Sequence, residues 1–322
     1  MKSNGWKILV KALVSAGLLG LLLSNMDLEG VGDSWLHLHP GWLLLCLAVM
    51  TLSNILGACQ WWLLLKNSGL PIPLGRAISY YYSGLFFNYV LLSFVGGDLL
   101  RIYDIAQDSG NRKVAMSTVF LDRLVGMTTL VTLAVIFGLW YSDTMAATGM
   151  FFPVLGLFGL MAFIGAFFYF KKFAKHFQAI GDRILPASIV QHLRDFYNSV
   201  NYFRAHKSVL LRVGAMSLVT QTLRVMSHFL VAHALLIHHS IPVSLPIFFV
   251  FIPVIFIATL LPVSIGGLGI REQAGVLLFA MVGFTAGQAF SMELLTYLLG
   301  ILAGVPGGII FILRKQVKVA TS

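Results

Sequence analysis

The stretch Asn88-Tyr-Val-Leu-Leu-Ser-Phe-Val-Gly-Gly-Asp-Leu-Leu-Arg101 decides the fold, because a second stretch of the chain repeats its plan. Ala258-Thr-Leu-Leu-Pro-Val-Ser-Ile-Gly-Gly-Leu-Gly-Ile-Arg271 aligns with it without a gap, at a shift of 170 residues. Both place a glycine pair inside an apolar segment and an arginine four residues after the second glycine. The same shift carries apolar run 42–65 onto 212–235, and 115–141 onto 285–311. A register shared by three elements indicates an internal repeat.

The composition places the chain in a membrane. Of its 322 residues, 58% are hydrophobic and 11% are charged, whereas a soluble fold carries about 25% charged residues. The 22 Lys+Arg, against 12 Asp+Glu, fall in short connections between apolar segments, as anionic headgroups and the positive-inside rule favour. Nucleic acid is therefore not expected as a partner. Cys46 and Cys59 share one apolar stretch, so we expect no disulfide framework, metal site or cofactor.

Apolar length predicts the spans. Two apolar segments, 78–109 and 244–286, are interrupted by the glycine pairs, and we expect Pro253 and Pro262 to break the first arm of the second segment. The expected fold is an all-α integral membrane protein with six full transmembrane helices and two re-entrant or broken helical hairpins. The runs long enough to cross about 30 Å of hydrocarbon are 8–24, 42–65, 115–141, 149–170, 207–238 and 287–313.

Loop charges predict the orientation, because Lys and Arg are retained in the cytoplasm. The loop 25–40 has no Lys or Arg and is expected outside, whereas the connection 171–206 is rich in both and is expected to be a cytoplasmic amphipathic segment. Both termini are then cytoplasmic, and the two hairpins enter from opposite faces. The chain is expected to be a single polytopic membrane domain, 1–322, with an inverted-topology repeat of about 42–141 and about 207–313.

The hairpin tips carry the candidate chemistry. Asp98 suits a helix N-cap, and the arm from Asp98 to Ser109 covers about 18 Å, so the helix would begin near mid-bilayer. Backbone amides, the positive end of a helix dipole and a guanidinium would converge there, which suits a phosphate. The structural alternative is that Arg101 pairs only with Asp98 or Asp104, and that Glu272 neutralises Arg271. The candidate lipid-phosphate residues are Gly96, Gly97, Asp98, Arg101, Gly266, Gly267, Gly269, Arg271 and Glu272.

Further polar residues lie within the apolar segments. Because ionisable groups at bilayer depth are costly, they are expected to face the interior of the bundle and to line a pathway. Hydrogen bonding between helices explains each of them individually at least as well. These residues are Asn88, Asp122, Arg123, Arg224, His228 and Glu293.

Together these motifs resemble the lysylphosphatidylglycerol synthase transmembrane-region family, the flippase-like domain of the multiple peptide resistance factor, which also occurs as stand-alone proteins. The resemblance implies a lipid-translocating domain. The sequence departs from the family pattern at Leu92-Ser93, where a proline is usual, and at Asp122, where Glu is usual. Because the chain ends at Ser322, directly after the last helix, we expect no soluble aminoacyl-transferase domain and no synthase activity. The motifs that carry the resemblance are Phe87-Asn88, Gly96-Gly97-Asp98 with Arg101, Asp122-Arg123-Leu124, Leu261-Pro262 and Gly266-Gly267-Leu268-Gly269-Ile270-Arg271-Glu272.

The leading functional hypothesis is a lipid flippase or transporter of the cell inner membrane that binds a phosphate-bearing headgroup, of a phospholipid or a polyprenyl phosphate, between the two tips. One alternative is a membrane-embedded transferase with a lipid-phosphate donor and Asp98, Asp104 or Asp122 as base. Another is a non-catalytic subunit that docks a separate synthase or transferase through the connection 171–206. A homodimer through the glycine-rich face of the last helix is a further hypothesis.

Overall fold

Helices form all the regular structure of the described residues in the computed structural model. The described residues are 20, 35–36, 38–70, 72–90, 96–169, 206–236, 244–259 and 267–314. The all-α prediction is confirmed for this part of the chain. The predicted span 8–24 apart from Gly20, nearly all of the connection 171–206, and the residues Pro262 and Gly266 lie outside it.

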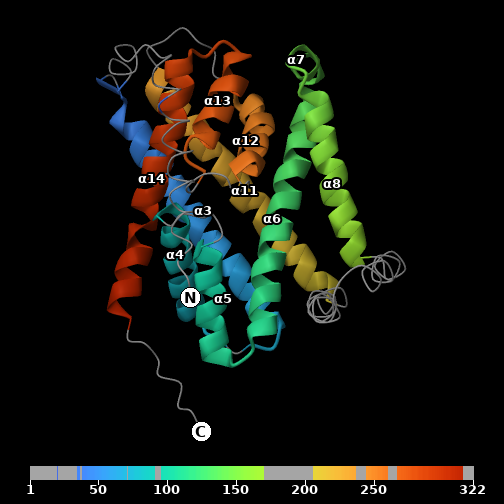
Figure 1. Ribbon diagram of the computed structural model, residues 1–322, viewed down its shortest axis with the longest axis vertical. Helices are drawn as coiled ribbons and strands as arrows, with labels where there is room; N and C mark the ends of the chain where they lie inside the picture. Colours follow the sequence, from blue (N-terminus) through green and yellow to red (C-terminus); the bar gives the residue numbers. More distant parts are fainter. Residues whose placement is uncertain are drawn as a thin grey trace.

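In the described part of the chain, four long helices run along the molecule (Figure 1). They are α3 (Pro40–Asn67), α6 (Arg112–Trp140), α11 (Lys207–Leu236) and α14 (Ala286–Leu313). Each has the length and apolar composition to cross a membrane, so the chain is a multi-pass membrane protein. The apolar helix α8 (Phe151–Tyr169) is shorter and follows α6 through the short α7 (Ser142–Ala147), so the count of six full spans stays a prediction.

Side-chain caps set where two of the long helices begin. The Asn111 side chain accepts a hydrogen bond from the Val114 amide (3.1 Å) at the start of α6. At the start of α14, the Gln288 amide donates to the Thr285 hydroxyl (3.2 Å), and the Thr285 amide donates to the Gln288 side chain (2.9 Å). These contacts satisfy amides that a helix start leaves without intrahelical partners, and they fix the start of each span.

The two interrupted segments form hairpins of short helices. The first consists of α4 (Leu74–Val90) and α5 (Gly96–Ser109), and the second of α12 (Leu245–Thr259) and α13 (Ile270–Ala280). The longest, α4, has 17 residues and covers about 26 Å, less than the roughly 30 Å of a hydrocarbon core. The first hairpin lies in the lower half of Figure 1 and the second in the upper half.

The expected break at Pro253 is wrong, because α12 continues through this residue. A proline removes one backbone donor and leaves one carbonyl without its intrahelical partner, which membrane helices tolerate where neighbouring protein encloses the site. Pro253 is buried, and so are Phe248 and Phe251 on the same helix. Both pack on Phe279 of α13, with ring centroids 5.0 and 5.3 Å apart. Packing therefore holds the second hairpin together.

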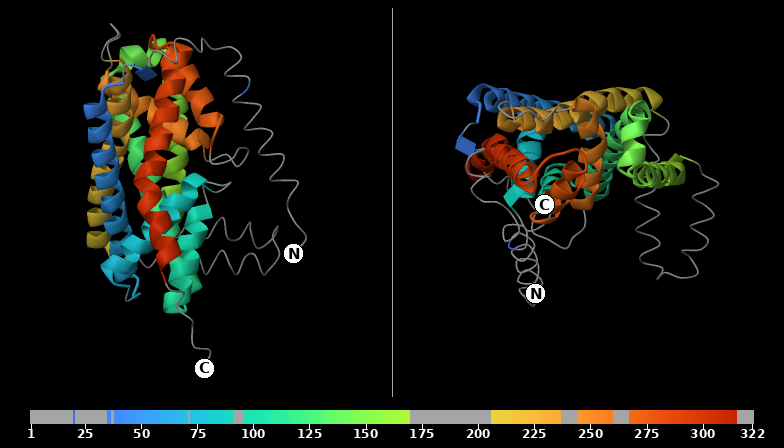
Figure 2. Two further views of the ribbon diagram at one scale, coloured as in Figure 1. Left: turned by 90° about the vertical axis from the view of Figure 1, so that its left-hand side faces the viewer. Right: turned by 90° about the horizontal axis from the view of Figure 1, so that it is seen from above.

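Each hairpin packs against a long helix from the other half of the chain. The α4 helix lies against α14, and α12 lies against α6, while α3 runs beside α11 (Figure 2). The first contact is close: a Cβ at Gly307 of α14 would overlap the backbone carbonyl of Tyr82 in α4. Within the first hairpin, a Cβ at Gly97 would likewise overlap the carbonyl of Gly84. Glycines thus let the backbones meet around the centre of the bundle.

Candidate functional site

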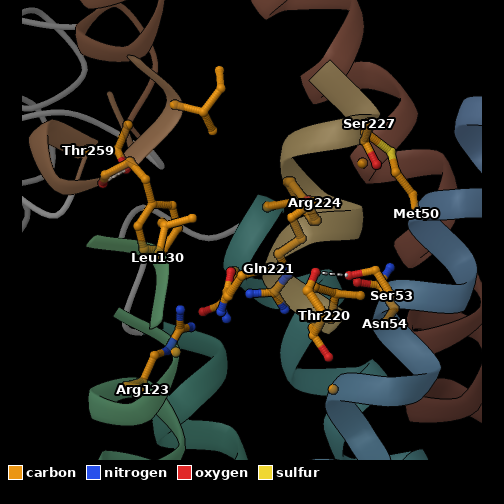
Figure 3. Close-up of a pocket in the computed structure, with 18 of the residues that line it drawn as sticks. Met50, Ser53, Asn54, Arg123, Leu130, Thr220, Gln221, Arg224, Ser227 and Thr259 are labelled. Atoms are coloured by element: carbon orange, nitrogen blue, oxygen red, sulfur yellow. Dashed lines mark hydrogen bonds between the residues drawn. The ribbon is translucent and has the colours of Figure 1, made fainter. Parts of the chain in front are cut away.

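A cavity of about 210 Å³ lies where the two hairpins face the long helices. Its walls hold four arginines, Arg101 of α5, Arg123 of α6, Arg224 of α11 and Arg271 of α13. Figure 3 shows Gln221 and Arg224 reaching from α11 between Arg123 on one side and α3 on the other. The cavity wall is therefore rich in guanidinium groups, and both tip arginines reach it.

At the first tip, two arginines and two aspartates form a closed network. Arg101 donates to Asp98 (3.3 Å) and Asp122 (3.0 Å), and its guanidinium lies 4.0 Å from the ring centroid of Trp61. Arg123 donates a hydrogen bond to each oxygen of Asp98, at 2.7 and 3.1 Å. Such paired, charge-assisted bonds neutralise all four formal charges within the cluster. The structural alternative therefore holds in part, because Arg101 pairs with Asp98, although it also pairs with Asp122 and lines the cavity.

At the second tip, one arginine lies beside two buried carboxylates. Arg271 pairs with Glu272, and its Nε lies 3.6 Å from a Glu293 oxygen. The other Glu272 oxygen accepts from the Gly269 amide (2.7 Å), which caps α13. The guanidinium also lies 4.4 Å from the Tyr297 ring centroid. Glu272 thus neutralises Arg271, as the structural alternative states, and Arg271 still reaches the cavity wall.

One backbone amide at each tip is already engaged by a side chain. Asn88 accepts a hydrogen bond from the Gly97 amide (2.9 Å), and Glu272 accepts from that of Gly269. The expectation that Asp98 is an N-cap is wrong, because α5 begins two residues earlier and the Asp98 carboxylate is bound to arginines. A phosphate at these two amides would have to displace a side chain, so the tip helices offer less to an anion than their sequence indicates.

The predicted residues divide into two groups. Those that line the cavity are Asn88, Arg101, Asp122, Arg123, Arg224, His228 and Arg271. Those that are described but do not line it are Gly96, Gly97, Asp98, Gly267, Gly269, Glu272 and Glu293. The second group packs behind the arginines: Glu272 and Glu293 are fully buried, and Gly97 touches the neighbouring helix backbone. Gly266 lies outside the described residues.

Arg224 differs from the other three arginines. In the described ranges its side-chain partner is a neutral group, the Tyr81 hydroxyl (3.2 Å), and no carboxylate lies within ion-pair distance. Its carbonyl contacts the ring of His228 (3.1 Å), one turn along α11. A guanidinium in such a cavity without an anionic partner is costly, and an anion that enters the cavity would remove this cost.

Several cavity residues carry no motif that sequence reasoning could use. Tyr81 and Tyr89 lie on α4, and Tyr297 on α14 donates to the Tyr89 carbonyl (2.8 Å). The only signal of Tyr81 is its place in the run of tyrosines 80–82. Asn54 and Gln221 differ from these tyrosines: they are polar residues within long apolar helices, which marks them as facing the interior of the bundle.

No cluster of three His, Cys, Asp or Glu side chains is placed to hold a metal ion in the part of the chain that the structure describes. The cavity chemistry is therefore that of guanidinium, amide and hydroxyl groups, which bind anions and hydrogen-bonding ligands.

Comparison with known proteins identifies the family but no individual relative. No curated protein matches the chain. A family model described as the lysylphosphatidylglycerol synthase TM region matches residues 8–309, which is nearly the whole chain. This match confirms the resemblance carried by the glycine pairs and arginines, and the chain belongs to the lysylphosphatidylglycerol synthase TM region family.

Proposed function

We propose that this protein moves a lipid across the membrane by binding its phosphate-bearing headgroup in the arginine-lined cavity. The observation that carries the proposal is Arg224, a cation that lines a cavity inside a membrane bundle and lacks a carboxylate partner in the described ranges. A phosphate offers a guanidinium both a charge and hydrogen-bond acceptors. Arg101, Arg123 and Arg271 place further guanidinium groups around the same space, although carboxylates neutralise each of them.

The size of the cavity supports a headgroup rather than a whole lipid. Its volume of about 210 Å³ is below the roughly 300–1,000 Å³ of pockets that enclose drug-sized ligands. The acyl or prenyl tails would therefore remain in the hydrocarbon, and only the polar end would enter the protein. This division suits translocation, because the polar end is the part that a bilayer excludes.

We further propose an inverted repeat, with both termini cytoplasmic, as the architecture behind this movement. In this repeat α4, α5 and α6 correspond to α12, α13 and α14. The contact of α4 with α14 then corresponds to that of α12 with α6, and the contact of α4 with α5 corresponds to that of α12 with α13. These matched contacts support the repeat. The positions of the hairpins in opposite halves of the molecule also support it (Figure 1). Such repeats give transporters two related conformations around a site at the repeat interface.

The transferase alternative gains less support, because its candidate bases are occupied. Asp98 and Asp122 are bound to the arginines of the first tip, and Asp104 pairs with Arg314 (2.6 Å). A general base needs a free oxygen within reach of the substrate proton. No specific contact favours the docking-subunit alternative over translocation.

Vesicles reconstituted with the purified protein and a tail-labelled phosphatidylglycerol test the proposal. The rate at which the label becomes protected from, or exposed to, an external quencher measures movement. Arg224→Gln is expected to lower the rate about 10- to 100-fold, because a hydrogen bond to a charged group contributes roughly 1.5–3 kcal/mol. Arg212→Gln, on the same helix but exposed, is the matched control and is expected to leave the rate unchanged. A wild-type rate in Arg224→Gln would refute the proposal.

A further inference from the structure

Two buried amide side chains in the cavity wall have no hydrogen-bond partner in the described ranges. Asn54 of α3 is 8% exposed and Gln221 of α11 is 6% exposed, and both line the cavity beside Arg224. An amide offers two N–H donors and a carbonyl acceptor, and burial without partners costs free energy. Buried amides of this kind are therefore expected where another group inside the cavity forms hydrogen bonds with them.

The Gln221 amide has space made for it on the opposite helix. A Cβ at Gly126 of α6 would lie 2.8 Å from the Gln221 Nε2, which is closer than real Cβ contacts allow. The glycine therefore lets the amide extend across the cavity toward α6. Because Arg224 lies three residues along the same helix, the amide and the guanidinium share one face of α11.

The acidic side chain that lines the cavity is engaged on both of its oxygens. Asp122 is the carboxylate that lines the cavity in the described part of the chain. One of its oxygens accepts from Gln60 (3.0 Å) and the other from Arg101 (3.0 Å). A ligand with an ammonium group would therefore meet four guanidinium groups and no free carboxylate.

We propose that the headgroup bound here is anionic and carries hydroxyl groups, as in a phosphoglycerol or a phosphorylated polyol, and that headgroups with an ammonium group are excluded. The assignment rests on the proposed function for the place of the phosphate at Arg224. It adds that Asn54 and Gln221 bind the hydroxyls, since a hydroxyl both donates and accepts and so matches an amide. A site with buried amides rejects a ligand that leaves them unpaired.

Binding of short-chain lipids to the purified protein in detergent tests this assignment apart from transport. The probes are dihexanoyl phosphatidylglycerol, phosphatidylinositol, phosphatidylmethanol and phosphatidylethanolamine, and the readout is the concentration that gives half of the maximal rise in melting temperature. Phosphatidylmethanol has the same phosphodiester charge as phosphatidylglycerol but no hydroxyl. We expect at least one of the two hydroxyl-bearing lipids to bind about tenfold more tightly than phosphatidylmethanol, and phosphatidylethanolamine to bind most weakly. The stronger of the two then separates a glycerol from a ring polyol.

Variants locate the preference. Asn54→Leu and Gln221→Leu are expected to lower affinity for the preferred lipid about tenfold and to leave affinity for phosphatidylmethanol unchanged. Gly126→Ala retains every polar group but displaces the Gln221 amide, and it is expected to reduce the preference in the same direction. Gln107→Leu, exposed on α5, is the matched control and should bind all four lipids as the wild type does.

The outcomes separate the two proposals. Equal affinity for phosphatidylmethanol and both hydroxyl-bearing lipids, or binding of phosphatidylethanolamine as tight as theirs, overturns the assignment of the headgroup even if vesicles show lipid movement. A hydroxyl preference that the leucine variants abolish supports the assignment, and it does so even if no lipid moves in vesicles, in which case translocation is the proposal that falls.

Discussion

Neutralising the two carboxylates beside Arg271 should change stability in opposite directions. Glu272 and Glu293 are both fully buried. Glu272 binds the Gly269 amide and Arg271, whereas neither Glu293 oxygen has a hydrogen-bond partner in the described ranges and its nearest cation atom is the Arg271 Nε at 3.6 Å. We therefore expect Glu272→Gln to destabilise the protein and Glu293→Gln to stabilise it.

The contacts set the magnitudes. A glutamine at position 272 can accept from either the Gly269 amide or Arg271, but it presents an N–H group to the other donor. We therefore expect the free energy of unfolding to fall by about 3 kcal/mol, for a charge-assisted bond and a helix cap together. At position 293 the change removes a buried carboxyl whose ionised form no donor solvates, and with it a loose attraction to Arg271. The desolvation cost is the larger of the two, so we expect a net gain of about 1 kcal/mol.

Thermal melting in detergent, followed by the fluorescence of the six tryptophans, measures both changes. At about 2 °C per kcal/mol for a chain of this size, Glu272→Gln should lower Tm by about 6 °C and Glu293→Gln should raise it by about 2 °C. Asp143→Asn, exposed on α7, is the control with no expected change. If Glu293→Gln lowers Tm as much as Glu272→Gln does, the pair at 3.6 Å holds the tip and the reasoning is wrong.

Two further predictions concern the first tip. Gly97→Ala should sharply reduce the yield of folded protein in size-exclusion chromatography, because its Cβ would overlap the Gly84 carbonyl, whereas Gly214→Ala, with open space around it, should leave the yield unchanged or improve it. Asp98→Asn should lower Tm by about 4 °C, since it weakens both bonds to Arg123 by about 2 kcal/mol together; an unchanged Tm would mean that Arg123 finds another acceptor.

The sequence predicts the helices well, because bilayer thickness limits the length of a spanning helix and capping residues fix where it begins. The apolar run 115–141 corresponds to α6 at Arg112–Trp140, and the difference at its start comes from Asn111, which caps the helix beyond the apolar residues. In the first hairpin the glycine pair forms the start of α5, and in the second Gly267 lies shortly before α13. Pro253 misleads because a rule learned from isolated helices ignores the surrounding protein, and this proline is buried inside the bundle.

The candidate site is harder to predict, because residue type says what a side chain can bind but not which partner reaches it first. The Gly97 amide is taken by Asn88 from the other arm, and Asp98 is shared between two arginines. Arg224 is left with a neutral partner, Tyr81, which lies 143 residues away in the chain. The packing of the helices determines which groups pair. As a result, the cation without a carboxylate partner in the described ranges lies on α11 and not at the tips. Substitutions at the tip glycines should therefore report on folding, and substitutions at Arg224 on binding.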